Sequence, residues 1–542
     1  MELSSARAEV LHLSVQVATA LILIYTASVL IYNGYFHPLR RFPGPPLAAF
    51  TSLWYFKRIR TGNPRDVQHP LHEKFGDFVR IGPKILAVRH PDAIETIFGT
   101  KKDSGSPVWR KAAFYDSFDP HIPNARTDSF SERDDARNAE RRRLVGSLYA
   151  QGNVLRYEAC VDRLIDIFQQ RMKMLADPVA GPDADSTQRA RTALDMSVWL
   201  ERYTFDVIGA VFHGRREGFG MLRQGADYNG WCYLMGVMPD IGAAVSYLPW
   251  GFRSLYMLSQ LVFQSSRDGL RGMLDVTRQA ERATHERWEQ MQRQKGTGIS
   301  SETDILTGLL EMVQQQTNED RTSTSKTSWT VADVVTEVWA VIWAGSDTTA
   351  TALTSIFYHV HKHPQALAKL RAEIDSAFED GRLQFPIRFS DARKLPYLHA
   401  VILESMRVHP SIGIGLPREV PPGGAKIGGT FIPGGIEVIV NPAAIHHDER
   451  CFGPDAREWI PERWLSSDTE AVRQMQRFMM HFGHGPRVCV GRHISNIEMY
   501  KLIPTLLRQF KFQMLVDRWE VQGSWFHRAG NVQCTVKTRK FT

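Results

Sequence analysis

The segment Phe482-Gly-His-Gly-Pro-Arg-Val-Cys-Val-Gly491 places one cysteine, Cys489, in a glycine-rich loop. An apolar stretch from Gly491 to Phe510 follows and is predicted to form a helix. The glycines permit positive φ angles and a close approach of the backbone to a flat ligand. Loop N–H groups and a helix N-terminus stabilise an anionic sulfur, so we expect the pKa of the Cys489 thiol to be lowered. Arg487 can pair with a carboxylate of the same ligand.

A thiolate beside room for a planar group suggests an axial ligand of haem iron. Such a ligand donates electron density to the iron and favours O–O bond cleavage. The alternative is a buried structural cysteine, because free cysteine often behaves as a small hydrophobic residue. For an isolated cysteine, the structural role is the better interpretation. Only the spacing of the neighbouring residues favours a role for Cys489 as a haem ligand.

The spacing FxxGxRxCxG is met at Phe482, Gly485, Arg487, Cys489 and Gly491, and the segment resembles the haem-binding loop of cytochrome P-450. Three further family motifs precede it in the expected order. They resemble the oxygen-activating site of the central helix, the ExxR pair and the PERF segment, at Ala344-Gly-Ser-Asp-Thr-Thr349, Glu404-Ser-Met-Arg407 and Pro461-Glu-Arg463-Trp464. The resemblance implies a mainly α fold with a minor β part, a long central helix over haem b, and an N-terminal transmembrane helix. Within the family, the sequence most resembles membrane-bound fungal members that act on secondary metabolites.

The ExxR pair also has a physical interpretation. Glu404 and Arg407 are three residues apart on a predicted helix, so they share a face and can pair. Alone, such a pair is usually exposed and contributes little stability. The resemblance implies instead a buried pair, joined by Arg463, that holds the haem loop and is needed for haem incorporation. Trp464 stands where the family usually has Phe, and because the aromatic bulk is kept we expect no loss of function.

The central helix is predicted from the Thr330–Asp333 capping box to Pro364. It is apolar almost all round, so it should be buried. Small residues such as Gly345 can leave room for dioxygen, and they occur where helices kink or form π-bulges. The resemblance implies that Thr348 and Asp347 supply a route for protons. The alternative is a tight helix crossing with the Thr348 hydroxyl bonded back to the chain.

The basic run Arg141-Arg142-Arg143 precedes a stretch that resembles the family helix whose basic residue pairs with a haem propionate. The register favours Arg142 for this role. Asn138 occupies the position where the family often has a second donor, Trp or His. Arg418, after the ExxR helix, is another candidate partner. The other arginines of the run form either a solvated helix face or a docking surface for an acidic reductase.

An N-terminal membrane anchor is expected. Leu11 to Tyr32 contains no Asp, Glu, Lys or Arg, and as a helix it would span roughly 33 Å, enough for a hydrocarbon core of ~30 Å. A cleaved signal peptide is the alternative, but no clear cleavage site precedes Asn33. Basic residues after the stretch place the body in the cytosol. The chain then divides into an anchor (1–35), a proline-rich hinge (36–50) and a haem-thiolate catalytic domain (51–542), single-pass in the endoplasmic reticulum membrane.

Composition excludes several classes of protein. The chain has 542 residues, 43% of them hydrophobic, and a formal charge of +8. These values exclude a mainly disordered chain, a collagen and a polytopic membrane protein. The positive charge is modest and dispersed, so no nucleic-acid partner is expected. The five cysteines show neither zinc-site spacing nor a disulfide framework.

Hydrophobic periodicity predicts further helices over 155–174, 195–212, 365–378 and 395–408. Strands are predicted over 79–88, 436–440 and 426–432, the last with a hairpin turn at Gly428-Gly429. The polar stretches 177–191, 294–303 and 315–328 are expected to be loops.

The resemblance implies a monooxygenase that inserts one oxygen atom of O₂ into a lipophilic small molecule, with electrons from NADPH–cytochrome P-450 reductase. The implied pocket is apolar and aromatic, which suits a secondary-metabolite intermediate such as a terpenoid, polyketide or alkaloid. Its walls are expected at 104–129, 412–416, Trp339, Ala340, Trp343 and Trp525-Phe526. The stretch 235–263 is expected to dip into the membrane or to form ordinary core helices. The alternatives are a reductase-independent haem-thiolate isomerase or dehydratase, which would not need the Asp347-Thr348 pair, and a non-enzymatic haem sensor or lipid-binding protein.

Overall fold

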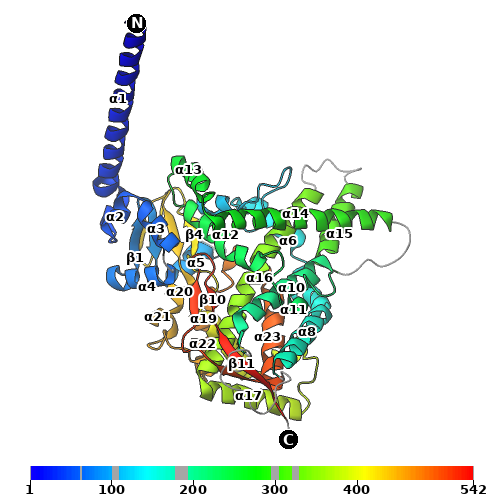
Figure 1. The fold of residues 1–542 in the computed structure, drawn as a ribbon. Coiled ribbons are helices and arrows are strands. Elements are labelled where there is room, and N and C mark those ends of the chain that lie inside the picture. Colours follow the sequence, from blue (N-terminus) through cyan, green and yellow to red (C-terminus); the bar gives the residue numbers. More distant parts are fainter. Residues whose placement is uncertain are drawn as a thin grey trace.

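The computed structural model describes residues 2–61, 64–99, 109–176, 193–294, 304–319 and 329–540. The first helix, α1 (Glu2–Ile31), stands away from the body and continues into a π-helical turn, η1 (Tyr32–Phe36) (Figure 1). Residues His12–Phe36 are long and apolar enough to cross a membrane, and the most apolar part of this stretch is not buried against the body, whereas Asn33 near its end is buried. These properties fit a single-pass anchor.

The body is mainly helical and is built around α16 (Val331–Lys362). Its predicted capping box is present, because the Thr330 hydroxyl accepts from Asp333 N and the Asp333 carboxylate accepts from Thr330 N. The helix is α-helical throughout, so the π-bulge considered near Gly345 does not form. α10 (Met196–His213), α14 (Gln264–Arg293), α19 (Pro396–Val408) and α23 (Arg492–Gln509) pack around it.

The helices predicted from periodicity are present within a few residues of the expected ends. They are α8 (Glu158–Ala176), preceded by the 3-10 turn η4 (Leu155–Tyr157), α10, α17 (Pro364–Glu379) and α19. The remaining described helices are α2 (Pro46–Phe50), α3 (Leu53–Thr61), α4 (Pro64–Phe75), α5 (Asp92–Phe98), α6 (Asp135–Val145), α7 (Gln151–Val154), α11 (Met221–Gln224), α12 (Trp231–Val245), α13 (Trp250–Gln260), α15 (Ile305–Glu319), α18 (Phe389–Ala392), α20 (Pro442–His446), α21 (Glu449–Phe452) and α22 (Thr469–Phe478), with short 3-10 turns η2 (Pro38–Arg41), η3 (Ala113–Phe118), η5 (Pro461–Leu465) and η6 (Gly485–Arg487).

The β part is small. A four-stranded sheet has the order β1–β2–β7–β4, from β1 (Phe78–Gly82), β2 (Ile85–Val88), β7 (Glu437–Val440) and β4 (Leu416–Glu419). The predicted hairpin joins β5 (Ala425–Ile427) to β6 (Thr430–Ile432), with Ile427 opposite Thr430 across the two glycines. A three-stranded sheet contains β3 (Leu194–Asp195), β11 (Gln533–Thr538) and β8 (Phe510–Met514), and a pair contains β9 (Glu520–Gln522) and β10 (Arg528–Gly530).

One predicted loop is partly wrong. Residues 315–319 form the polar end of α15, where Gln316 Oε1 accepts from Trp329 N at 2.7 Å. The rest of this loop, 320–328, lies outside the described residues. So do the whole of the predicted loop 177–191 and all of the predicted loop 294–303 except residue 294.

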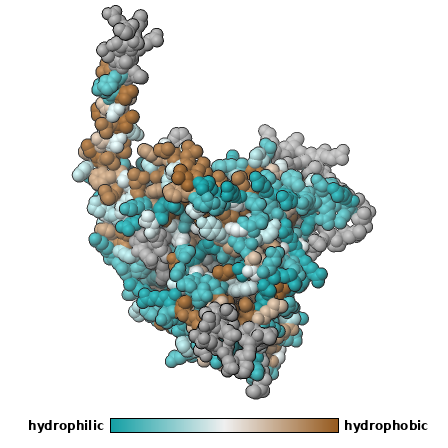
Figure 2. Space-filling model, viewed as in Figure 1, coloured by the Kyte–Doolittle hydropathy of each residue, from teal (hydrophilic) through white to brown (hydrophobic). Residues whose placement is uncertain are grey.

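Exposed apolar side chains gather where α13 lies beside the base of α1. Figure 2 shows this hydrophobic surface continuing from α1 onto the adjacent body. Its members on the body are Phe252, Leu255, Leu258, Leu261, Val262 and Phe263, together with Leu47 of α2 and Leu53 of α3. The stretch 235–263 is thus divided, since α12 is largely core whereas α13 presents an apolar surface.

Candidate functional site

The cysteine loop is held by its own backbone. Cys489 N donates to Phe482 O at 2.8 Å, and Gly483 N donates to Met480 O at 2.8 Å. Gly485 has φ +66°, and a Cβ there would lie 1.7 Å from the carbonyl oxygen of Phe98. The loop therefore needs glycine at this position both for conformation and for space.

Cys489 is accessible to solvent on part of its surface, although protein atoms surround most of the thiol. Burial raises its pKa, and the N–H groups of Gly491 and Arg492 and the guanidinium of Arg142 act in the opposite direction. The expected net lowering of the Cys489 pKa is therefore wrong for the thiol alone, because desolvation outweighs these groups. A coordinating metal ion would reverse the balance, since it deprotonates a bound thiol outright.

Four cations lie around this loop. Arg142 Nη1 donates to Val488 O at 2.6 Å, beside the cysteine. Arg487 pairs with Asp135 at 2.6 Å and donates to Glu132 O. Arg418, 4% exposed, donates to the Tyr115 hydroxyl at 3.0 Å and lies over the Phe98 ring.

Lys111 is the fourth cation, and sequence reasoning missed it. It is buried, donates to Phe130 O, and bridges to Arg418 through an isolated β-bridge. Burial and repulsion from Arg418 and Arg487 hold its pKa well below the usual value. Arg418, Arg487 and Lys111 thus lie close enough to repel one another, an arrangement that favours binding of an anion. Lys111 has no motif around it, so only its place in the fold reveals this role.

The three consecutive arginines of α6 have different environments. Arg141 is buried and pairs with Glu337 of the central helix at 2.5 Å. Arg142 reaches the cysteine loop, whereas Arg143 is exposed. Asn138 is buried and its amide donates to Ser129 O at 2.9 Å, so it anchors the preceding loop.

The ExxR pair is fully buried and joined by Arg463. Arg407 makes two hydrogen bonds of 2.8 Å to the two carboxylate oxygens of Glu404, and Arg463 Nε lies 3.0 Å from Glu404 Oε1. Arg407 also donates to the backbone oxygens of His446, Ala456 and Glu458. The network therefore ties α19 to the segment that leads into the cysteine loop.

Trp464 belongs to the same network. Its indole Nε1 donates to Glu404 Oε2 at 2.9 Å, a bond that phenylalanine could not make. Ile460 N donates to Glu404 Oε1 at 2.8 Å. Every acceptor direction of this buried carboxylate is thus used, as a buried charge requires.

On the central helix, the Thr348 hydroxyl donates to Ala344 O at 2.7 Å, the back-bonded arrangement considered above. Ala344 is exposed and Thr348 half-buried, so this face of the helix borders open space. Its neighbour Thr349 bonds to Ser495 on α23 at 2.8 Å, which brings the central helix against the helix that follows Cys489. A Cβ on Gly345 would lie 2.4 Å from Ile208 Cδ1, so Gly345 is small because α10 packs against it.

Asp347 faces away from that open space, toward β10. Its Oδ2 lies 3.4 Å from Arg528 Nε, and Arg528 also pairs with Glu201 of α10. Burial raises the pKa of both carboxyl groups, and Arg528 lowers them. The sequence gives no indication of this triad, because its members come from three separate elements.

Aromatic rings from two of the segments expected to form the substrate pocket pack together in one hydrophobic cluster. The ring centroids of Phe118 and Trp525 lie 5.0–5.7 Å from each other and from those of Phe114 and Phe130, in tilted or T-shaped arrangements. The 412–416 stretch meets them through the bridge between Ile412 and Phe526. Residues 104–108 of the expected wall lie outside the described residues.

The fold and these motifs define a haem-thiolate oxidoreductase, and comparison with known families agrees. The cytochrome P-450 family model matches residues 43–527, and the chain belongs to this family. Family members bind haem iron through a cysteine thiolate and incorporate oxygen from O₂ into a small-molecule substrate with electrons from a redox partner.

Its relatives are fungal enzymes. The chain is 32% identical to the cytochrome P-450 monooxygenase gsfF of Penicillium aethiopicum, over 95% of this chain and 96% of that protein. It is 32% identical to a pisatin demethylase of Fusarium vanettenii, over 94% and 91%, and 30% identical to the cytochrome P-450 monooxygenase pkfB of Emericella nidulans, over 97% and 96%. The chain is therefore an oxygen-incorporating oxidoreductase of the monooxygenase type.

Proposed function

We propose that the protein inserts one oxygen atom of O₂ into a lipophilic secondary-metabolite intermediate, with electrons from NADPH delivered by NADPH–cytochrome P-450 reductase. The observation that carries the proposal is a solvent-accessible thiol, Cys489, in a glycine-rich loop with Arg142, Arg418, Arg487 and Lys111 around it. This arrangement fits haem b, a flat group with an iron to ligate and two carboxylates to neutralise. When bound, the haem supplies the oxygen-activating chemistry.

In this proposal Cys489 ligates the iron, and Phe482, Gly485 and Gly491 shape the loop around it. Arg142, Arg418 and Arg487 hold the propionates, and we add Lys111 to this group. Its buried ammonium forms no ion pair with the described residues, and its low pKa would return toward normal beside a carboxylate. Glu404, Arg407 and Arg463 keep the loop in position.

Thr348 and Asp347 are proposed to deliver protons. The Thr348 hydroxyl borders the open face of α16, and Asp347 occupies the next position, with its carboxyl group buried behind the helix. Delivery requires the Asp347 side chain to leave Arg528 and turn toward Thr348. Gly345 contributes the close packing of α10 that fixes the helix at this point.

The substrate class follows from the lining. The aromatic cluster around Phe114 and Trp525 favours flat, apolar molecules. The buried indole N–H groups of Trp339 and Trp343 have no hydrogen-bond partner among the described residues. A substrate with oxygen acceptors on that side would satisfy them, so we infer an oxygen-bearing aromatic or polycyclic compound.

We further propose that 1–35 anchors the protein in the endoplasmic reticulum membrane, that 36–50 is the hinge, and that 51–542 is the cytosolic catalytic domain. The exposed apolar surface of α13 beside α1 supports this orientation (Figure 2). Arg137 and Arg143 are exposed on α6, the helix whose Arg142 contacts the cysteine loop, and are suited to an acidic reductase.

The deciding experiment is the difference spectrum of the reduced protein with carbon monoxide, for wild type and Cys489→Ala. A strongly red-shifted Soret band in wild type, absent from the variant, is expected for a thiolate-ligated haem on Cys489. An unshifted band in wild type would contradict this ligation. Product formed only with NADPH and reductase would support the monooxygenase, whereas product without NADPH would support an isomerase or dehydratase.

A further inference from the structure

A cavity of about 290 Å³ lies between the end of α3 and the α13–α14 junction, away from the cysteine loop. Its lining residues are Phe56 and Arg60 of α3, Tyr256 and Gln260 of α13, and Phe263, Ser265 and Ser266. Nothing in the monooxygenase chemistry uses this space.

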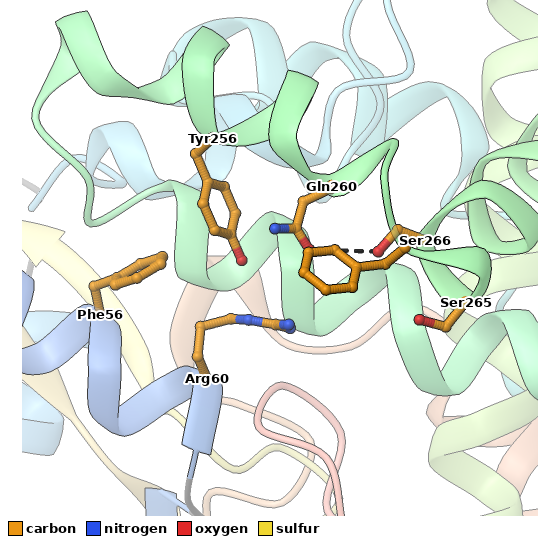
Figure 3. Close-up of a pocket in the computed structure, with 7 residues that line it drawn as sticks. Phe56, Arg60, Tyr256, Gln260, Ser265 and Ser266 are labelled. Carbon is orange, nitrogen blue, oxygen red and sulfur yellow. Dashed lines mark hydrogen bonds between the residues drawn. The ribbon is translucent and has the colours of Figure 1, made fainter.

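Hydrogen-bond donors are directed into the cavity. Figure 3 shows the Tyr256 hydroxyl, the Gln260 amide and the Arg60 guanidinium pointing toward the same space from two helices. The Tyr256 hydroxyl oxygen is buried and has no hydrogen-bond partner among the described residues. Gln260 is 7% exposed, and its Oε1 accepts from Ser266 Oγ at 3.3 Å, which leaves the NH₂ group turned into the cavity.

Among the described residues that line the cavity, Arg60 is the charged one. Within the described part of the chain, Arg60 makes no ion pair. Burial raises the pKa of the nearby Asp240, and the backbone N–H groups of Ser524 and Trp525, which donate to its Oδ1, offset this more than Arg60 does. A guanidinium, a phenol hydroxyl and an amide NH₂ are together able to donate hydrogen bonds to the oxygens of a phosphate group.

The position of the cavity indicates the source of the phosphate. Phe263 lines the cavity and belongs to the exposed apolar surface formed by α13 and the residues that follow it, which includes Leu258 and Leu261 and extends toward the candidate membrane span (Figure 2). Arginine and tyrosine at the edge of an apolar surface lie at the depth of lipid headgroups in a membrane. A phosphate compound free in solution has no acyl chains, so it would gain nothing from an apolar surface beside its binding site.

We propose that this cavity binds the phosphate group of an anionic membrane phospholipid, with the acyl chains lying along α13. Arg60 neutralises the phosphate, while Tyr256 and Gln260 donate to its oxygens. A cationic headgroup such as choline would be repelled by Arg60, so lipids without one are preferred. The bound lipid would join α3 to α13 and fix the body against the bilayer. This inference does not depend on the proposed reaction.

The test uses the full-length protein in phosphatidylcholine nanodiscs that contain a photoreactive phosphatidic acid. Labelling of 53–61 or 250–266 is measured by peptide mass spectrometry for wild type, Arg60→Gln, Tyr256→Phe and the control Arg58→Gln. Arg58 carries the same charge on the same helix but lies over Trp54 and does not line the cavity. Labelling is expected to fall roughly tenfold in Arg60→Gln, to fall less in Tyr256→Phe, and to stay unchanged in Arg58→Gln.

Equal labelling of Arg60→Gln and Arg58→Gln would overturn the proposal. So would equal labelling by a photoreactive diacylglycerol, which has the same chains and no phosphate. Saturable binding of inorganic phosphate that depends on Arg60, without labelling by the lipid, would overturn the lipid assignment. Thermal melts of each variant establish that a loss of labelling does not come from misfolding.

Discussion

Arg528 Nε lies 3.4 Å from Asp347 Oδ2, and the same guanidinium pairs with Glu201. One cation therefore serves two buried carboxyl groups behind the central helix. Gly236 of α12 makes this possible, because a Cβ there would lie 2.3 Å from Arg528 Nη1. The triad holds the Asp347 carboxyl group beside Arg528, where Glu201 competes for the same guanidinium.

The first prediction concerns Glu201→Gln. Without the Glu201 carboxylate, the Arg528 guanidinium interacts with Asp347 only, so the pKa of Asp347 should fall. The pH at which product formed per NADPH declines should then move to lower values. A pH profile for wild type, Glu201→Gln and Asp347→Asn measures this. If the pH profile of Glu201→Gln is unchanged while Asp347→Asn forms clearly less product per NADPH, Glu201 has no role in proton delivery and Asp347 has one.

Thr348→Ala should uncouple NADPH use from product formation. General acid–base steps contribute roughly 10²–10⁴-fold, so product per NADPH should fall by at least about tenfold while peroxide rises. Thr348→Ser keeps the hydroxyl and is the matched control, expected to stay near wild type. If Thr348→Ala remains fully coupled, the hydroxyl has only the back-bonded structural role seen with Ala344 O.

Glu404→Gln should abolish haem incorporation. It leaves Arg407 and Arg463 buried without their shared anion, and breaking a buried pair costs about 3–5 kcal/mol. Absorbance of haem per protein after purification measures the loss.

Trp464→Phe makes a smaller change in the same network. It removes only the Nε1 bond to Glu404, worth about 1.5–3 kcal/mol for a charged acceptor, and should keep the haem but lower Tm by several degrees. An unchanged Tm would mean that water replaces the indole. The expectation that Phe and Trp are equivalent here rested on bulk alone.

Buried neutral histidine should make the protein acid-labile. Both ring nitrogens of His213 lack hydrogen-bond partners among the described residues, and burial lowers its pKa from 6.5 to about 3. A depressed folded-state pKa contributes stability above pH 6.5 that is lost as pH falls toward 3. His213→Phe should therefore gain about 2 kcal/mol more at about pH 5 than at neutral pH. Denaturant titrations at both pH values test this, and an equal effect at each would contradict the assigned cause.

Removal of residues 1–35 should release the integral anchor but not all membrane association. The apolar side chains of α13 remain and should keep the truncated protein bound peripherally. Adding Leu255→Ser and Leu258→Ser should make it soluble in membrane flotation. A truncated protein that is already soluble would show that α13 does not enter the bilayer.

Local sequence determined much of this protein. The Thr330–Asp333 capping box, the Gly428-Gly429 hairpin and the cysteine loop each depend on residues a few positions apart, so composition and spacing suffice to predict them. Apolar periodicity likewise predicted the helices, because it records which face of each segment must be buried. The family motifs then gave the reaction class.

Tertiary structure decided the pairings between distant residues. Glu201 and Arg528 are 327 positions apart, and Lys111 meets Arg418 across a comparable distance in the chain. The environments of Arg141, Arg142 and Arg143 differ because adjacent positions on a helix face different neighbours. The cavity beside α13 exists only because α3 packs near it. Such contacts depend on how helices and strands pack against one another. A local sequence pattern does not encode which two charged residues become neighbours in the folded protein.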